Sequence, residues 1–344
     1  MKPFQKNLAL AIDGGGIKGV IVTKALSIVE EKLGIRLHER AGLTAGTSTG
    51  SIIAAGLAAG LEAERLNELY LALGDEIFHT SLRSLLWPLF NYRYPNRPLK
   101  KALEKYLGDG MMASLWNAEQ QHMDVVITTY DVVEARTRFI KPYKNDYADW
   151  PVVKAVLASA AAPTYFPAVE GQYIDGGVGA YGNPCYLAAY EIKFMLKWKP
   201  EETTLISIGT GRDPNTLKPG DVNRFLPLRY INPILDAFQV SSADQQVTLV
   251  EKLFPGLDFR RFQVDLKRSI QMDDPSSIPE LTQYGEELGK MMLNDETDRA
   301  MGVTPKAIFR VTKSASRRQT NKSGSRRGAR PHKSAKPAGA RQRR

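Results

Sequence analysis

A serine at position 48 lies between two glycines in the pattern Gly46-Thr47-Ser48-Thr49-Gly50. The pattern follows a short apolar run and precedes a long segment of small residues, which predicts a strand, a sharp turn and a helix. Such a turn exposes a serine hydroxyl at the edge of a sheet, and the helix N-terminus offers backbone N–H groups to developing negative charge. Ser48 is therefore our candidate nucleophile for acyl transfer, with the Thr49 amide as one donor to the oxyanion.

A second chemical feature is the glycine loop at residues 13–19, which reads Asp-Gly-Gly-Gly-Ile-Lys-Gly. It follows an apolar run at residues 7–12 and precedes a helical spacing of apolar residues over 20–33. A glycine loop between a strand and a helix makes an anion-binding turn. At the edge of the same sheet, the amides of Gly15 and Gly16 would face the oxyanion formed when the serine attacks a carbonyl.

The same glycines admit a second interpretation. The spacing Gly14-x-Gly16-x-x-Gly19 matches the dinucleotide-binding fingerprint. That fingerprint also requires a strand ending in an acidic residue about twenty positions on, to bind a ribose hydroxyl. The expected position falls near Glu39, in a polar stretch that does not resemble a strand end. A Walker loop is excluded because no Ser or Thr follows Lys18 and its glycine. We favour the oxyanion loop and keep nucleotide binding as an alternative.

The serine needs a base. In the order used by α/β-hydrolases the histidine follows the acid, and after Asp175 only the last histidine of the chain remains. The four histidines are His38, His79, His122 and His332. Asp175 ends a short apolar run and is followed by two glycines, which allow a tight turn beside the serine. A carboxylate with an ordinary pKa of about 3.9 is a weak base, but it can orient the hydroxyl and accept its proton.

Alternating strands and helices must position these groups. The sequence predicts strands at residues 7–12, 123–129, 135–140 and 204–209, and helices over 20–33, 61–76 and 152–162. This alternation indicates an α/β fold with three layers, α/β/α, and a mostly parallel central sheet. Active residues in such sheets gather at the carboxyl ends of strands, where we expect Asp13, Ser48, Asp175 and Gly209.

Charge divides the chain into two parts. Of its 47 Lys and Arg residues, twelve follow residue 312 with no acidic residue among them, leaving 35 against 37 Asp and Glu before it. We therefore predict a domain at residues 1–312 and a basic disordered tail at 313–344. Such a tail would bind anionic partners, membrane or nucleic acid, without sequence readout. It supports a further alternative, a non-catalytic protein that binds anionic surfaces.

Other segments carry weaker signals. Residues 77–103 combine basic and aromatic side chains without an acid until Glu104, which fits either a lipid-facing surface or packed core. The single cysteine, Cys185, predicts a reducing compartment and a buried thiol. The charge-free residues 43–61 predict a strand end and a buried helix, so we expect a cytoplasmic protein that contacts membranes peripherally. Residues 212–306 predict mainly helix, with a last strand at 307–311.

Four motifs in series give the chain a resemblance to the patatin-like phospholipase family. They are residues 13–19, Gly46–Gly50, Ala158–Pro167 (Ala-Ser-Ala-Ala-Ala-Pro-Thr-Tyr-Phe-Pro) and Asp175-Gly176-Gly177, within about residues 7–211. The resemblance implies a three-layer α/β/α fold and a dyad without histidine, Ser48 as nucleophile and Asp175 as base. The residues that match the family's oxyanion loop are Gly14, Gly15, Gly16 and Lys18.

The resemblance also implies the activity. Members of the family are calcium-independent lipid acyl hydrolases, so we expect a phospholipase A type of enzyme that acts on phospholipids or related acyl lipids, with no cofactor or metal. One departure is that residues 178–182 separate Asp175-Gly176-Gly177 from Asn183-Pro184, which the family joins more closely. This departure affects the shape of the local loop and, with it, the preference for acyl chains.

Overall fold

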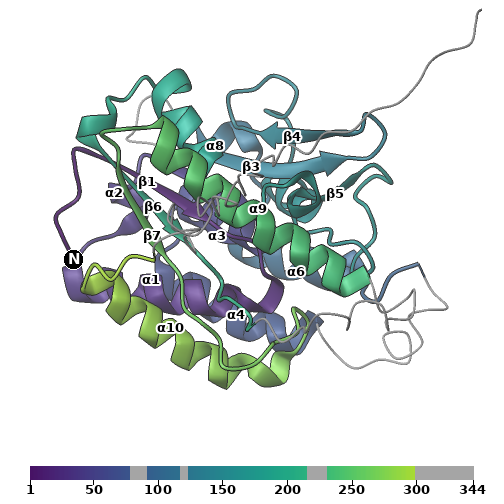
Figure 1. Cartoon of the computed structure of the whole chain (residues 1–344). Coiled ribbons are helices and arrows are strands. Elements are labelled where there is room, and N and C mark those ends of the chain that lie inside the picture. The colour runs from purple at the N-terminus through teal and green to yellow at the C-terminus, as the bar shows by residue number, and fades with distance from the viewer. Residues whose placement is uncertain (78–90, 117–122, 215–230, 299–344) are drawn as a thin grey trace, which may run out of the picture. The chain divides into compact units, whose positions relative to one another are not determined.

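The computed structural model describes residues 1–77, 91–116, 123–214 and 231–298 of the chain (Figure 1). Its centre is a sheet of seven strands in the order β4-β3-β2-β1-β6-β7, with β5 paired to β3 off this path. The pairs between β3 and β7 along this order are parallel, whereas β4 and β5 run antiparallel to β3. The strands are β1 (Asn7–Ile12), β2 (Leu43–Thr47), β3 (Asp124–Asp131), β4 (Arg136–Ile140), β5 (Tyr173–Asp175), β6 (Thr203–Ile208) and β7 (Asp258–Phe262).

Helices cover both faces of this sheet, as the alternation of strand residues requires. On one face, the alternate β1 residues Leu8, Leu10 and Ile12 join a core with α1, α3, α4, α6, α7 and α10. On the other, Ala9 and Ala11 join a smaller core with α8 and α9. Figure 1 shows α9 crossing the face opposite α1 and α10. The helices are α1 (Gly19–Leu33), α2 (Leu37–Arg40), α3 (Thr49–Ala58), α4 (Ala63–Ile77), α6 (Asn96–Leu107), α7 (Val152–Ser159), α8 (Cys185–Tyr190), α9 (Ile231–Leu253) and α10 (Ile278–Leu293).

The predicted three-layer α/β/α class is confirmed, and so are the strands expected at residues 7–12, 123–129, 135–140 and 204–209, within one or two residues. Among the helices of the described ranges, none is both long and apolar enough to cross a membrane. Cys185 is fully buried, as predicted, and burial raises the pKa of its thiol to about 12.

The sequence analysis missed one strand. Residues 212–306 are mainly helical where the structure describes them, but they also contain β7, which pairs with β6. Its sequence, Asp-Phe-Arg-Arg-Phe, hides the strand because two arginines occupy buried positions that usually take apolar residues. Asp175 lies at the end of a strand, as predicted, and this strand runs antiparallel to β3.

Several sequence predictions lie outside the described residues. These are the strand at 307–311, the tail at 313–344 with its boundary at residue 312, and much of the basic and aromatic stretch at 77–103. The part of that stretch that the structure describes includes buried core residues, Tyr94, Leu99 and Leu103.

Candidate active site

Ser48 occupies the turn between β2 and α3 with φ 53° and ψ −124°. A side chain at positive φ is strained, and such strain persists only where the surroundings enforce it. The flanking glycines allow the tight turn, because a Cβ on Gly46 would overlap the backbone of Gly50, and one on Gly50 would overlap the Ile12 carbonyl. The predicted serine elbow is therefore present, with the N-terminus of α3 directly behind the hydroxyl.

Strand pairing brings Asp175 to the same place. Two strands pair with the same edge of β3, one after the other. The pairing with β2 ends where Thr47 lies opposite Thr128 of β3, and the pairing with β5 starts at the next β3 residue, Thr129, which lies opposite Asp175. The edge is shared because β4 occupies the other edge of β3 at these positions. The last residues of a parallel and an antiparallel strand therefore meet end to end, which places the carboxylate beside Ser48.

The Asp175 carboxylate is buried, and it accepts a hydrogen bond from the amide of Gly177 at 2.7 Å. Burial raises the pKa of Asp175 to about 6, and the Ser48 hydroxyl and the Gly177 amide limit the rise. Burial opposes ionisation because the charged form loses its hydration. The result is a stronger base than an exposed aspartate, still ionised at neutral pH.

The end of α7 and the residues just after it hold both Ser48 and Asp175 through their backbones. The amide of Ser48 donates to the Oγ of Ser159 at 2.9 Å, and the amide of Asp175 donates to the carbonyl of Ala161 at 3.0 Å. Ser159 is fully buried. Ser159 belongs to the motif at Ala158–Pro167, but the motif alone does not indicate its role. The available signal was its place in an otherwise apolar helix end, where a buried hydroxyl needs a partner.

The glycine loop lies against Ser48. Some of its polar groups are already bound by other parts of the protein, and others are available to a ligand. The Gly14 amide donates to the Gly182 carbonyl at 2.9 Å, so in this structure it is engaged by the protein. The Lys18 ammonium pairs with Asp213 at 3.0 Å, away from the residues that line the Ser48 cavity. Within the described residues, the amides of Gly15 and Gly16 have no protein acceptor. They are the loop's available donors.

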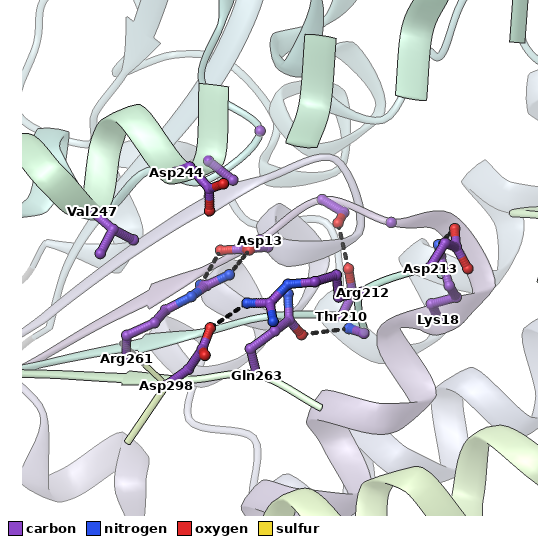
Figure 2. A pocket seen from close by; sticks show the side chains of 15 residues that line it. Asp13, Lys18, Thr210, Arg212, Asp213, Asp244, Val247, Arg261, Gln263 and Asp298 are labelled. Atoms are coloured by element: carbon purple, nitrogen blue, oxygen red, sulfur yellow. Dashed lines mark hydrogen bonds and ion pairs between the residues drawn. The ribbon is translucent and has the colours of Figure 1, made fainter. Parts of the chain in front are cut away.

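Residues from four distant segments hold this loop in shape. The Thr210 hydroxyl donates to the Gly14 carbonyl at 2.6 Å, and the Ile17 amide donates to the Met272 carbonyl at 2.9 Å. The Gly182 carbonyl belongs to the segment 178–182 that departs from the family pattern, so this departure supports the loop directly. The fourth contact is an ion pair at Asp13 (Figure 2).

Tyr70 of α4 fixes the first turn of α3. Its hydroxyl donates to the Thr49 carbonyl at 2.8 Å and also contacts the Thr49 hydroxyl. Burial raises the pKa of Tyr70 well above its usual value, so the phenol stays neutral. The Thr49 amide belongs to the first turn of the helix, where no intrahelical acceptor exists.

An apolar cavity opens over the dyad. Ser48 and Asp175 line it together, with Gly16 and Thr49 at the same wall. Its remaining lining is almost entirely hydrocarbon and aromatic: Ile17, Ile52, Tyr70, Leu73, Ile77, Leu99, Ala160, Ala162, Tyr165, Phe166 and Met272. A fatty-acyl chain bound in this cavity would be shielded from water, and its ester group would lie next to Ser48.

The histidines give no alternative base among the described residues. His38 lies in α2, just before the first residue of β2, whereas Ser48 follows the last residue of β2. The two residues are therefore at opposite ends of this strand. The other three histidines fall outside the described ranges. No group of three or more His, Cys, Asp or Glu residues in the described part is arranged to hold a metal ion.

Comparison with protein families decides the identity of this fold. The family model described as patatin-like phospholipase matches residues 10–189, which contain all four motifs. The chain belongs to the patatin-like phospholipase family. The match covers the elbow, the glycine loop and Asp175, but ends before β6, β7 and Met272.

Curated proteins similar to this patatin-like chain include enzymes of lipid hydrolysis. It is 30% identical over 224 residues to the intracellular phospholipase A2 of Caenorhabditis elegans, covering 60% of this chain and 20% of that protein. It is 29% identical over 318 residues to patatin-like protein 1 of Oryza sativa subsp. indica, covering 76% and 75%. It is 27% identical over 242 residues to the cGAMP-activated phospholipase of Vibrio cholerae, covering 62% and 66%. The chain thus spans only a fifth of the nematode protein.

Proposed function

We propose that this patatin-like protein is a calcium-independent lipid acyl hydrolase that cleaves fatty-acyl esters of phospholipids or related lipids through Ser48 and Asp175. The observation that carries the proposal is that the strained Ser48 and the buried Asp175 stand together in the wall of one apolar cavity. Relatives named as phospholipases support the substrate class. Because such substrates reside in bilayers, we expect peripheral contact with membranes.

The reaction follows from the positions of these groups. Asp175 takes the proton of the Ser48 hydroxyl as its oxygen bonds to the ester carbonyl carbon. The amides of Gly15, Gly16 and Thr49 stabilise the resulting oxyanion. Collapse of this intermediate breaks the ester bond, and the protonated Asp175 returns its proton to the leaving alkoxide. Water, activated by the same carboxylate, then hydrolyses the acyl-serine and releases the fatty acid.

Replacing Ser48 by alanine tests the proposal. The variant lacks the attacking oxygen, so release of fatty acid from phosphatidylcholine vesicles in EDTA should fall to the uncatalysed rate. Labelling by a fluorophosphonate probe should disappear as well, because the probe bonds to the same hydroxyl. The matched control is Ser51→Ala on the adjoining turn of α3, whose hydroxyl donates to the Ser48 carbonyl. Hydrolysis that persists in Ser48→Ala would refute the assignment.

The cavity should select acyl chains by length. Leu99 of α6 lines it, so Leu99→Phe would fill part of the space and lower kcat/KM for long-chain esters relative to short ones by about tenfold or more. Leu103 lies one turn further along the same helix, fully buried but outside the cavity lining. Leu103→Phe therefore controls for general overpacking. We expect it to lower stability without changing the ratio of kcat/KM values for 16-carbon and 4-carbon p-nitrophenyl esters.

A further inference from the structure

We propose that Arg261 of β7 is a positioning residue for this reaction, which orders the glycine loop through Asp13. The inference rests on the proposed function, and it assigns a role to a strand that lies outside the family match. It also gives a role to one of the two buried arginines of β7, whose sequence is Asp-Phe-Arg-Arg-Phe.

The contact between Arg261 and Asp13 has the geometry of a fixed support. Two guanidinium nitrogens donate to the two carboxylate oxygens, at 2.8 and 2.6 Å, and one of them also donates to the Ser207 hydroxyl at 2.8 Å. Both side chains are about 5% exposed. A bidentate pair fixes distance and orientation together, which a single hydrogen bond does not. Figure 2 shows the Arg261 guanidinium directed at the Asp13 carboxylate.

Asp13 transmits this restraint to the reacting groups because it is the first residue of the loop. Its amide is bonded to the Ile208 carbonyl at 3.0 Å, which anchors its backbone to β6. Only Gly14 separates it from Gly15 and Gly16, whose amides are proposed to hold the oxyanion. Because both the backbone and the carboxylate of Asp13 are held, the position and direction of the first residue of the loop are fixed.

Charge explains why the carboxylate depends on Arg261. Burial raises the pKa of Asp13, and the adjacent guanidinium opposes this rise through its charge and its hydrogen bonds. Without the arginine, a buried carboxylate would remain without its main partner, so it would take up a proton or move towards water. Either change displaces the start of the loop. A shift of about 1 Å in a catalytic group costs roughly a hundredfold in rate.

The neighbouring Arg260 supplies a matched control. It is equally buried, at 4% exposure against 5%, and it also pairs with carboxylates, those of Asp258 and Asp295. Successive strand residues face opposite sides of a sheet, so Arg260 lies on the face away from Asp13. Its guanidinium also donates to the carbonyls of Lys2 and Pro3. It therefore shares the burial and charge of Arg261 without a path to the loop.

The experiment compares Arg261→Met, Arg261→Lys and Arg260→Met with the full-length protein. Turnover of a soluble short-chain ester and hydrogen–deuterium exchange of the peptide covering residues 13–19 are measured for each. We expect Arg261→Met to lower kcat about a hundredfold with KM changed less than threefold, and to speed exchange of that peptide. Arg261→Lys should recover part of kcat, because it restores the charge but not the bidentate contact. Arg260→Met should lose thermal stability while keeping kcat and loop exchange near wild type.

Each outcome separates the inference from the proposed function. If the folded wild-type protein hydrolyses no ester, the proposed function fails, and the exchange of residues 13–19 still decides whether Arg261 orders the loop. Exchange unchanged in Arg261→Met overturns the inference, as does a loss of kcat no greater than that in Arg260→Met. If Arg261→Met does not fold, the same comparison is made with Arg261→Lys. A kcat and a loop exchange equal to those of the wild type in that variant would also overturn the inference.

Discussion

Asp175→Asn is expected to reduce ester turnover by about a thousandfold while making the protein more stable at neutral pH. The loss of activity follows because an amide cannot accept the Ser48 proton, and a general base contributes a factor of about 10² to 10⁴. The Asn oxygen can still accept the Gly177 amide, so the local turn should survive. Wild-type activity should fall as the pH drops below about 6, where the carboxyl becomes protonated.

The gain in stability follows from the direction of the pKa shift. Burial raises the pKa of Asp175 from 3.8 to about 6, so the folded protein holds this proton more tightly than the unfolded chain. The favourable contribution is fully present below the unfolded pKa and is lost as the pH rises through about 6. By linkage, two pKa units correspond to about 3 kcal/mol. The neutral Asn side chain does not carry this cost of ionisation.

Thermal unfolding at two pH values measures the effect. At pH 7.5 we expect the midpoint of Asp175→Asn to exceed that of the wild type by roughly 6 to 12 °C, and near pH 4 the two should converge. Kinetics on the same samples give the loss of turnover. Equal midpoints at pH 7.5 would show that ionisation of Asp175 does not lower the free energy of unfolding. Turnover above a tenth of wild type would rule out Asp175 as the base.

Gly50→Ala is expected to cost about 3 kcal/mol or more of folding stability, enough to lower the unfolding midpoint by roughly 6 to 12 °C. The added Cβ would overlap the carbonyl oxygen of Ile12 and approach that of Asp13, both backbone atoms of the β1 end. Backbone cannot rotate out of the way as a side chain can. Either the elbow or the start of the glycine loop must move, so catalysis should be lost as well.

Gly56→Ala in the same helix is the matched control. There the added Cβ would meet the end of the Leu66 side chain, which can change rotamer. The gain in helix propensity, about 1 kcal/mol, offsets part of the crowding. We expect its unfolding midpoint to stay within about 3 °C of wild type, with turnover retained. Equal losses in the two variants would show that helix packing, not the elbow, sets the requirement for glycine.

The parts of the site that follow from local pattern could be predicted from the sequence. Gly46, Ser48 and Gly50 predict an elbow by themselves, since the glycines are demanded by contacts within one turn. The glycine loop is similarly local, since it follows an apolar strand and precedes a helix. The sequence also placed Asp175 at a strand end, although the strand runs the other way. What matters is that β5 meets the end of β2 along the same edge of β3, and no local pattern encodes that meeting.

The partners that hold the site depend on long-range pairing and could not be predicted. Arg261 is 248 residues from Asp13 in the chain, and in the sequence it looks like one of two ordinary surface arginines. Ser159 is equally unremarkable until the Ser48 amide is found against it. The direction of a side chain is equally hard to predict: the Lys18 position in the loop suggests a role at the oxyanion, and in this structure its ammonium pairs with Asp213. Spacing identifies a residue's segment, but not which side its side chain takes.

The four contacts that hold the glycine loop also bear on when the site can be completed during synthesis, because their residues leave the ribosome at different times. A ribosome releases Ser48 and Asp175 long before Arg261 and Met272, and at about 5–20 residues per second the interval is roughly 5 to 20 s. During that time a nascent chain can form the elbow and the strand end that carries the base, but its oxyanion loop lacks two of its supports. Under the proposed mechanism, we therefore expect ester hydrolysis only after residue 272 has been synthesised and the glycine loop has all of its supports.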